Sequence, residues 1–250
     1  MLVQLAYGVT FTVAHDVMPL YLHAFGFITL RVGVTAILFF IVHSIFIKEK
    51  INWRKDWLLM VVCSLFGVAA NMLMFFKGLE ITTPINGAVL MLTTPVFVVL
   101  LAAGINHERI TIIKGAGILL AATGGLILIA GSDFNFSGKT LPGDILIILN
   151  ATSYALYLVL VKRLLGKYNT LTVSKWTFLI GLVMVLPFGF RELISADFTT
   201  MPQDIIFKIT FIVLCTTFLA YLLTAWAVIK IGSSTVGTYI YLQPLFTALI

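Results

Sequence analysis

Long apolar runs recur along the whole chain, and short breaks rich in charged residues, proline, glycine, serine or asparagine separate them. A helix that crosses roughly 30 Å of hydrocarbon needs about 20 predominantly apolar residues. The pattern therefore predicts nine membrane-spanning helices, over residues 1–18, 25–47, 57–77, 85–104, 111–131, 142–163, 172–190, 205–229 and 234–250. The predicted fold class is an all-α membrane protein.

The composition supports the lipid bilayer as the main partner of this chain. Hydrophobic residues make up 60% of the sequence and charged residues only 10%, and the mean hydropathy is +1.10. An average soluble domain carries about 25% charged residues. The core of a soluble 250-residue protein could not bury so much apolar surface while leaving so few charges to cover it.

The basic residues are unevenly divided between the two sides of the predicted bundle. Four lie in the breaks after the odd-numbered runs, and Arg31 lies within the second run. The other eleven follow the second, fourth, sixth and eighth runs: Lys48, Lys50, Arg54, Lys55, Arg109, Lys114, Lys162, Arg163, Lys167, Lys175 and Lys230. Cytoplasmic loops carry an excess of Lys and Arg, so the bias predicts a cytoplasmic N-terminus. We interpret these clusters as orientation signals and predict no nucleic-acid partner.

Two stretches of the chain share an architecture at a shift of 149 residues. Residues 73–101 and 222–250 each contain a run, a short Gly/Thr/Ser break and a second run with a proline midway, Pro95 and Pro244 respectively. Because proline removes a backbone donor and kinks a helix, we predict that both are hinges; simple packing kinks are the alternative.

The shift divides the chain into a first five-helix repeat, residues 1–131, and a second repeat, residues 142–250. An odd number of crossings per repeat makes the second copy enter the membrane from the other side, which gives inverted repeats. The second repeat lacks a counterpart of the fifth run. The expectation is a ten-helix (5+5) transporter bundle truncated to about nine helices.

Arg31 lies six residues into its predicted run, about 9 Å along a helix. Charge at such depth is costly and often functional. Two interpretations stay open: the side chain reaches the outer headgroups, or it holds a substrate carboxylate or a gating pair with Asp16.

Other polar and aromatic side chains at membrane depth predict a cavity for small polar or zwitterionic solutes. Hydrogen bonds that join helices are the alternative role for each of them. The candidates from this reasoning are Asn71, Thr94, Asn150, Tyr154, Tyr157, Tyr241 and Gln243.

An enzyme, a channel and a receptor are the competing classes. The sequence contains no His-Glu-x-x-His and no Gly-x-Ser-x-Gly motif, and its four histidines are scattered over different runs and breaks. We therefore predict no catalytic residue, metal or cofactor. No acidic residue falls in the middle of a run, so no carboxylate proton relay is predicted. A channel or receptor-like protein is the main alternative to a transporter.

Several motifs resemble the EamA-type transporters of the drug/metabolite transporter superfamily. They are residues 78–88 (GLEITTPINGA), 92–102 (LTTPVFVVLLA), the pair Glu108-Arg109, and 114–125 (KGAGILLAATGG). The resemblance implies ten helices around a central cavity and export of amino acids, metabolites or drugs by alternating access, in the bacterial plasma (inner) membrane. Tyr7 and Phe11, which look like part of the family's first helix, join the cavity candidates. A homodimer is left open.

Overall fold

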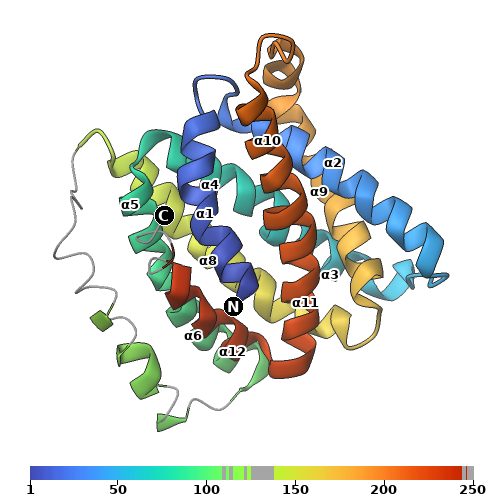
Figure 1. The fold of residues 1–250 in the computed structure, drawn as a ribbon. Coiled ribbons are helices and arrows are strands. Elements are labelled where there is room, and N and C mark those ends of the chain that lie inside the picture. Colours follow the sequence, from blue (N-terminus) through green and yellow to red (C-terminus); the bar gives the residue numbers. More distant parts are fainter. Residues whose placement is uncertain (109–110, 113–114, 121–122, 125–137, 244–245, 247–250) are drawn as a thin grey trace.

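The computed structural model describes residues 1–108, 111–112, 115–120, 123–124, 138–243 and 246, with the backbone alone at residues 11 and 12. Every element in this part is helical, which confirms the all-helical class (Figure 1). The elements are α1 (Leu2–Val17), α2 (Ala24–Phe46), α3 (Trp53–Ser64), η1 (Leu65–Ala69), α4 (Ala70–Ile81), α5 (Pro84–Leu90), η2 (Met91–Thr93), α6 (Thr94–Asn106), α8 (Leu141–Leu165), α9 (Thr170–Ser195), α10 (Gln203–Phe211), η3 (Ile212–Leu219), α11 (Ala220–Ile231), α12 (Ser233–Thr238) and η4 (Tyr239–Tyr241).

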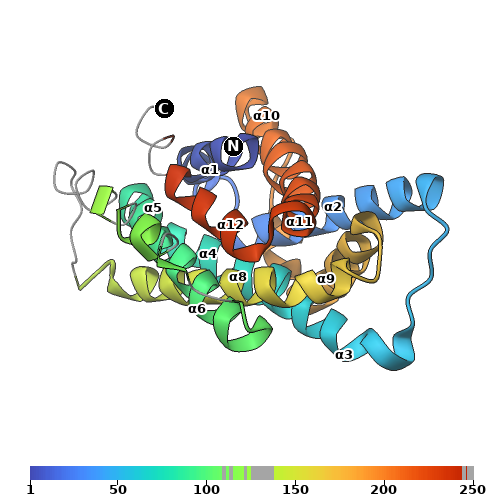
Figure 2. The same cartoon turned by 90° about the horizontal axis from the view of Figure 1, so that it is seen from below.

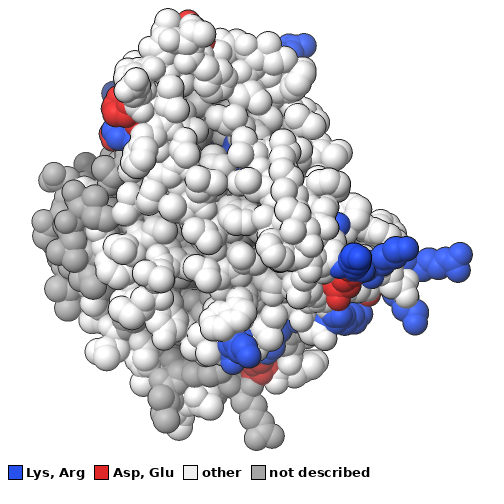
Figure 3. Space-filling model, turned by 45° about the vertical axis from the view of Figure 1, so that its right-hand side comes forward, with Lys and Arg blue, Asp and Glu red and all other residues white. Residues whose placement is uncertain are grey.

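Six continuous helical stretches are long and apolar enough to cross a membrane: Ala24–Phe46, Trp53–Ile81, Pro84–Asn106, Leu141–Leu165, Thr170–Ser195 and Gln203–Ile231. Large apolar side chains such as Phe46, Phe207 and Trp226 are exposed on their outer faces. Figure 3 shows a wide uncharged band with Lys and Arg gathered at its ends. The chain is a multi-pass membrane protein. Its orientation stays a prediction.

The described helices occupy the predicted runs, with boundaries shifted by a few residues. Most of the predicted run 111–131 and the end of the run 234–250 lie outside the described residues. The count of nine spans and the truncated ten-helix bundle therefore stay predictions.

Two antiparallel helix pairs, α4–α8 and α2–α9, make the most extensive contacts between helices. In the α4–α8 pair, Gly78 and Gly143 face each other, and a Cβ atom at Gly143 would lie 2.7 Å from the Gly78 carbonyl oxygen. In the α2–α9 pair, the Gly26 N–H donates to Glu192 Oε2 at 2.8 Å. Glycines at these crossings let the helix backbones approach closely.

Irregular helical segments recur along the chain. η1 is a π-helical segment between α3 and α4, and η3 is one between α10 and α11. Adding the predicted shift of 149 to residues 65–69 gives 214–218, which lies inside η3. The 3-10 segments η2 and η4 occupy similarly related positions. The inverted orientation of the two repeats stays a prediction.

The break at η2 locates one of the two predicted hinge residues. Pro95 is the second residue of α6, directly after η2. At the first turn of a helix the missing N–H of proline has no intrahelical partner to lose. Pro95 therefore lies where the helical stretch Pro84–Asn106 changes from a 3-10 to an α-helical segment. Its role as a hinge stays a prediction, and Pro244 lies outside the described residues.

Helix α1 lies at one face of the bundle, where Leu2 and Leu5 are exposed and its inner side packs against other helices. It contacts α4, α5, α10, η3 and α11, and Figure 2 shows α12 close beside it. The space between α1 and these neighbours contains the cavity described next.

Candidate functional site

A cavity of about 60 Å³, measured as space open to the centres of water molecules, lies between α1, α2, α4, α8 and α11. A single water needs roughly 10–15 Å³ on this measure, so the cavity has room for several waters or one small solute. Its lining residues are Tyr7, Thr10, Arg31, Asn71, Met72, Phe75, Phe76, Met91, Asn150, Tyr154, Tyr221 and Gln243.

Arg31 is the one charged residue in this lining. It projects from α2 and is 4% exposed. Its Nε–H donates to Thr217 Oγ1, and its Nη2 donates to the carbonyl oxygen of Thr216 at 3.2 Å. The guanidinium carbon lies 4.7 Å from the ring centroid of Phe76, a cation–π distance.

The amide side chains provide neutral polar groups. Asn150 Nδ2 donates to the Asn71 carbonyl oxygen at 2.8 Å, whereas Asn150 Oδ1 is buried without a hydrogen-bond partner among the described residues. Gln243 Nε2 donates to Gln4 Oε1 at 2.8 Å, joining the C-terminal part of the chain to α1. A solute in the cavity can thus find both charged and neutral hydrogen-bonding groups.

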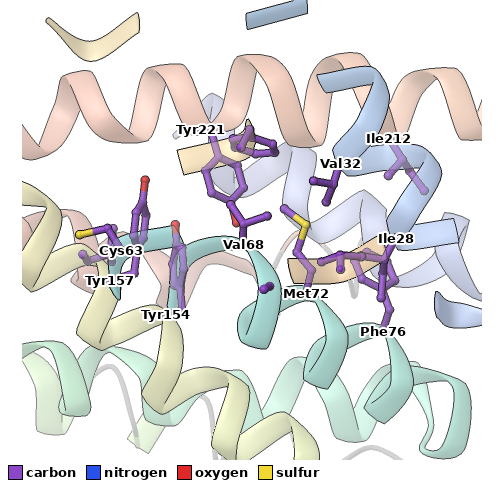
Figure 4. Packing of buried hydrophobic residues seen from close by; sticks show 14 of the residues in the cluster. Ile28, Val32, Cys63, Val68, Met72, Phe76, Tyr154, Tyr157, Ile212 and Tyr221 are labelled. Carbon is purple, nitrogen blue, oxygen red and sulfur yellow. The ribbon is translucent and has the colours of Figure 1, made fainter. Parts of the chain in front are cut away.

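Tyrosine rings form one wall of the cavity and its support (Figure 4). The ring of Tyr154 lies against that of Tyr157, with centroids 6.1 Å apart, and Tyr157 lies 6.1 Å from Tyr221. The Tyr221 hydroxyl donates to the Gly67 carbonyl oxygen in η1 at 2.6 Å. The described part of the chain has no group of three or more His, Cys, Asp or Glu side chains that could hold a metal ion.

Two segments of the chain, residues 1–130 and 141–250, match the model of the EamA-like transporter family. The chain belongs to this family. It is 30% identical to an uncharacterized transporter of Archaeoglobus fulgidus, over 84% of this chain and 75% of that protein. It is 28% identical to the uncharacterized transporter YyaM of Bacillus subtilis, over 81% and 67% respectively.

One solved crystal structure superposes with a TM-score of 0.76 and covers 99% of this chain and 84% of the other, at 16% sequence identity. At that identity the similarity concerns the fold alone. Both relatives are named as transporters, which supports a transporter role for this EamA-like protein.

Six of the ten cavity candidates line the cavity of this transporter: Tyr7, Arg31, Asn71, Asn150, Tyr154 and Gln243. Thr94, Tyr157 and Tyr241 do not. Thr94 and Tyr157 are buried against neighbouring helices, and the Tyr241 hydroxyl is buried away from this lining. The side chain of Phe11 lies outside the described part of the structure.

The two interpretations of Arg31 can now be compared. The side chain lies in the cavity wall, not on the outer surface of the bundle. Asp16 accepts a hydrogen bond from Lys208 at 2.8 Å, so it forms no gating pair with Arg31 in this structure. Of the predicted roles, a substrate-binding cation agrees with this placement.

Sequence reasoning missed six lining residues: Thr10, Met72, Phe75, Phe76, Met91 and Tyr221. Four of these are Met or Phe, which any lipid-facing or core position could carry. Tyr221 could have been found as a polar candidate, because a tyrosine buried in an apolar run usually has a hydrogen-bond partner for its hydroxyl.

Proposed function

We propose that this transporter exports small amphipathic metabolites, such as amino acids or related solutes, by alternating access around the Arg31 cavity. The supporting observation is that helices from both predicted repeats line one cavity with a cation, amides and aromatic rings. Transporters with internal repeats commonly bind their substrates at the repeat interface. We place the protein in the bacterial plasma membrane with its N-terminus in the cytoplasm.

Ion pairs near opposite ends of the bundle are candidate gates (Figure 1). At the α6–α12 end, Glu108 accepts hydrogen bonds from Lys162 at 2.7 Å and from Ser234 at 2.6 Å. At the α10 end, Lys208 of α10 pairs with Asp16 of α1 at 2.8 Å. In the proposed cycle these contacts break in turn, so that the cavity opens to one side at a time.

A direct test is expression in a bacterial host that is challenged with amino-acid analogues and drugs. We expect resistance to at least one group of compounds, with lower intracellular accumulation than in cells carrying an empty vector. The cavity-filling variant Asn150→Trp should lose this resistance at equal membrane abundance. Equal accumulation with and without the protein for every compound would overturn export, and ion-channel conductance in planar bilayers would overturn alternating access.

A further inference from the structure

We propose that the cavity selects net-anionic carboxylates, with Arg31 as the residue that binds the carboxylate, and disfavours zwitterions and amines of the same shape. This inference rests on the proposed function and narrows its solutes to those with a net negative charge, so that zwitterionic amino acids become poor substrates. It starts from the charge balance of the cavity.

Arg31 has no carboxylate partner among the described residues. Burying a cation without a counter-charge is costly. Among the described residues the compensation comes from neutral groups: the Thr216 carbonyl and hydroxyl, the Thr217 hydroxyl and the face of Phe76. Arginine stays charged and offers five N–H donors in a planar fork. Since Nη1 forms no hydrogen bond with the described residues, donors of Arg31 remain for a ligand.

The acidic residues that the structure describes give the cavity no negative charge. Of the ten in the chain, Asp133 lies outside the described residues, and none of the other nine lines the cavity. Asp16, the acid first considered for Arg31, is paired with Lys208. Among the described residues a ligand ammonium group would therefore find only neutral acceptors, such as Asn150 Oδ1, which has no hydrogen-bond partner there, while Arg31 repels it.

The position of Arg31 is fixed before a ligand arrives. Its hydrogen-bond partners lie in η3, where a π-helical turn disturbs the regular ladder of backbone hydrogen bonds, and Phe76 of α4 packs against it. The Thr217 hydroxyl that accepts from Arg31 also donates to the Ile212 carbonyl at 2.9 Å. A cation held on both sides loses little side-chain freedom when it binds an anion.

The remaining walls suit a short apolar tail. Met72, Phe75, Phe76 and Met91 contribute them, and Figure 4 shows Met72 and Phe76 together on α4. Combined with the small volume, this favours a carboxylate that carries a compact branched or unsaturated group.

The test uses four probes of similar shape: 3-methylbutanoate; its neutral amide; valine, which adds an ammonium group to it; and 2-methylpropylamine, which is valine without the carboxylate. Their binding to the full 250-residue chain in lipid nanodiscs is measured by calorimetry, with empty nanodiscs subtracted. We expect 3-methylbutanoate to bind best. The amide and valine should each bind about tenfold more weakly, and the amine should not bind detectably.

Two Arg31 variants and one matched control refine the result. Arg31→Gln should lower the affinity for 3-methylbutanoate by about 10- to 100-fold and leave that for the amide nearly unchanged. Arg31→Lys keeps the charge but loses the planar fork of donors, so its affinity for 3-methylbutanoate should lie between those of the wild type and of Arg31→Gln. Arg54→Gln makes the same chemical change at an exposed residue and should behave like the wild type.

Binding of valine or the amine equal to or tighter than that of 3-methylbutanoate would overturn the inference, as would no binding of any probe. This comparison uses the wild type, so it holds even if a variant fails to fold. Host cells that export another compound while the wild type binds no anion would overturn the inference alone. Selective anion binding without transport in vesicles would overturn the proposed function alone.

Discussion

The π-helical segments η1 and η3 occupy related positions in the two halves of the chain, yet different groups satisfy their carbonyl oxygens. In η1, Phe66 O accepts from the Ser153 hydroxyl at 2.9 Å and Gly67 O from the Tyr221 hydroxyl at 2.6 Å. In η3, Thr216 O accepts from the Arg31 guanidinium. The contacts that η1 receives from other helices are neutral hydroxyls of α8 and α11, whereas η3 receives the cation in the cavity wall besides hydroxyls of its own threonines.

This difference indicates that η1 contributes mainly to the stability of the bundle and η3 mainly to its preference among ligands. Variants around η1 should change stability while the preference among ligands stays constant. Variants around η3 should change the preference itself. The predictions below test that contrast, beginning with the largest expected effect.

Gly67→Ala should have the largest effect. Its new Cβ would overlap the ring of Tyr157, a buried side chain with little room to move. Overpacking of this kind costs about 3 kcal/mol at the upper end of its usual range. We expect a marked fall in thermal stability in detergent. Gly104→Ala, whose Cβ would meet nothing within 4 Å, is the control, and equal melting temperatures for the two variants would contradict the packing described for η1.

Tyr221→Phe removes the donor to Gly67 O and leaves a buried carbonyl oxygen without that partner. The expected loss of stability is about 1–2 kcal/mol, measured by thermal or denaturant unfolding. The affinity ratio between 3-methylbutanoate and its amide should stay as in the wild type. A changed ratio would show that η1 also contributes to ligand preference. Tyr239→Phe, at an exposed tyrosine, serves as the reference.

Thr217→Val tests η3. The variant keeps the side-chain shape but removes the hydroxyl that accepts from Arg31 Nε, so the guanidinium is less firmly placed. We expect 3-methylbutanoate to bind about fivefold more weakly, close to the worth of one hydrogen bond, with little change for the amide. Thr210→Val removes a hydroxyl that donates only to the Ile206 carbonyl of its own helix and should leave both affinities unaltered. An equal loss for both probes would point to a purely structural role of Thr217.

Lys208→Gln should have the smallest effect on stability. It breaks the pair with Asp16, in which both side chains are partly exposed. Exposed ion pairs contribute under about 1 kcal/mol, so the melting temperature should barely move. A loss as large as that of Tyr221→Phe would mean that this pair stabilises the bundle far more than its exposure suggests.

Much of the fold could be predicted from the sequence because the bilayer imposes a simple length and polarity rule on each helix. Arg31 stood out for the same reason, since an isolated charge in an apolar run is conspicuous. The rotation of each helix about its axis could not be predicted. Tyr154 and Tyr157 lie three residues apart on α8 and looked equivalent, but only Tyr154 lines the cavity, while Tyr157 packs against Gly67.

Asp144 shows a similar limit. It is the third residue of the predicted run 142–163, yet it is 1% exposed. Its Oδ1 accepts from the Thr82 hydroxyl at 2.5 Å and from Asn86 Nδ2 at 3.3 Å. These contacts cross from α8 to the C-cap of α4 and to the first turn of α5, and such pairing depends on which helices are neighbours. A single sequence does not contain that information.

The measurement that tests the central claim most directly is counterflow in proteoliposomes. Vesicles are loaded with unlabelled 3-methylbutanoate at pH 8, where the acid is ionised, and diluted into its labelled form. Vesicles with the wild type should transiently accumulate more label than protein-free vesicles, and excess valine should reduce this accumulation only weakly. With Arg31→Gln the accumulation should fall to the protein-free level, whereas with Arg54→Gln it should not. Undiminished counterflow in Arg31→Gln, or stronger competition by valine than by 3-methylbutanoate itself, would contradict the account.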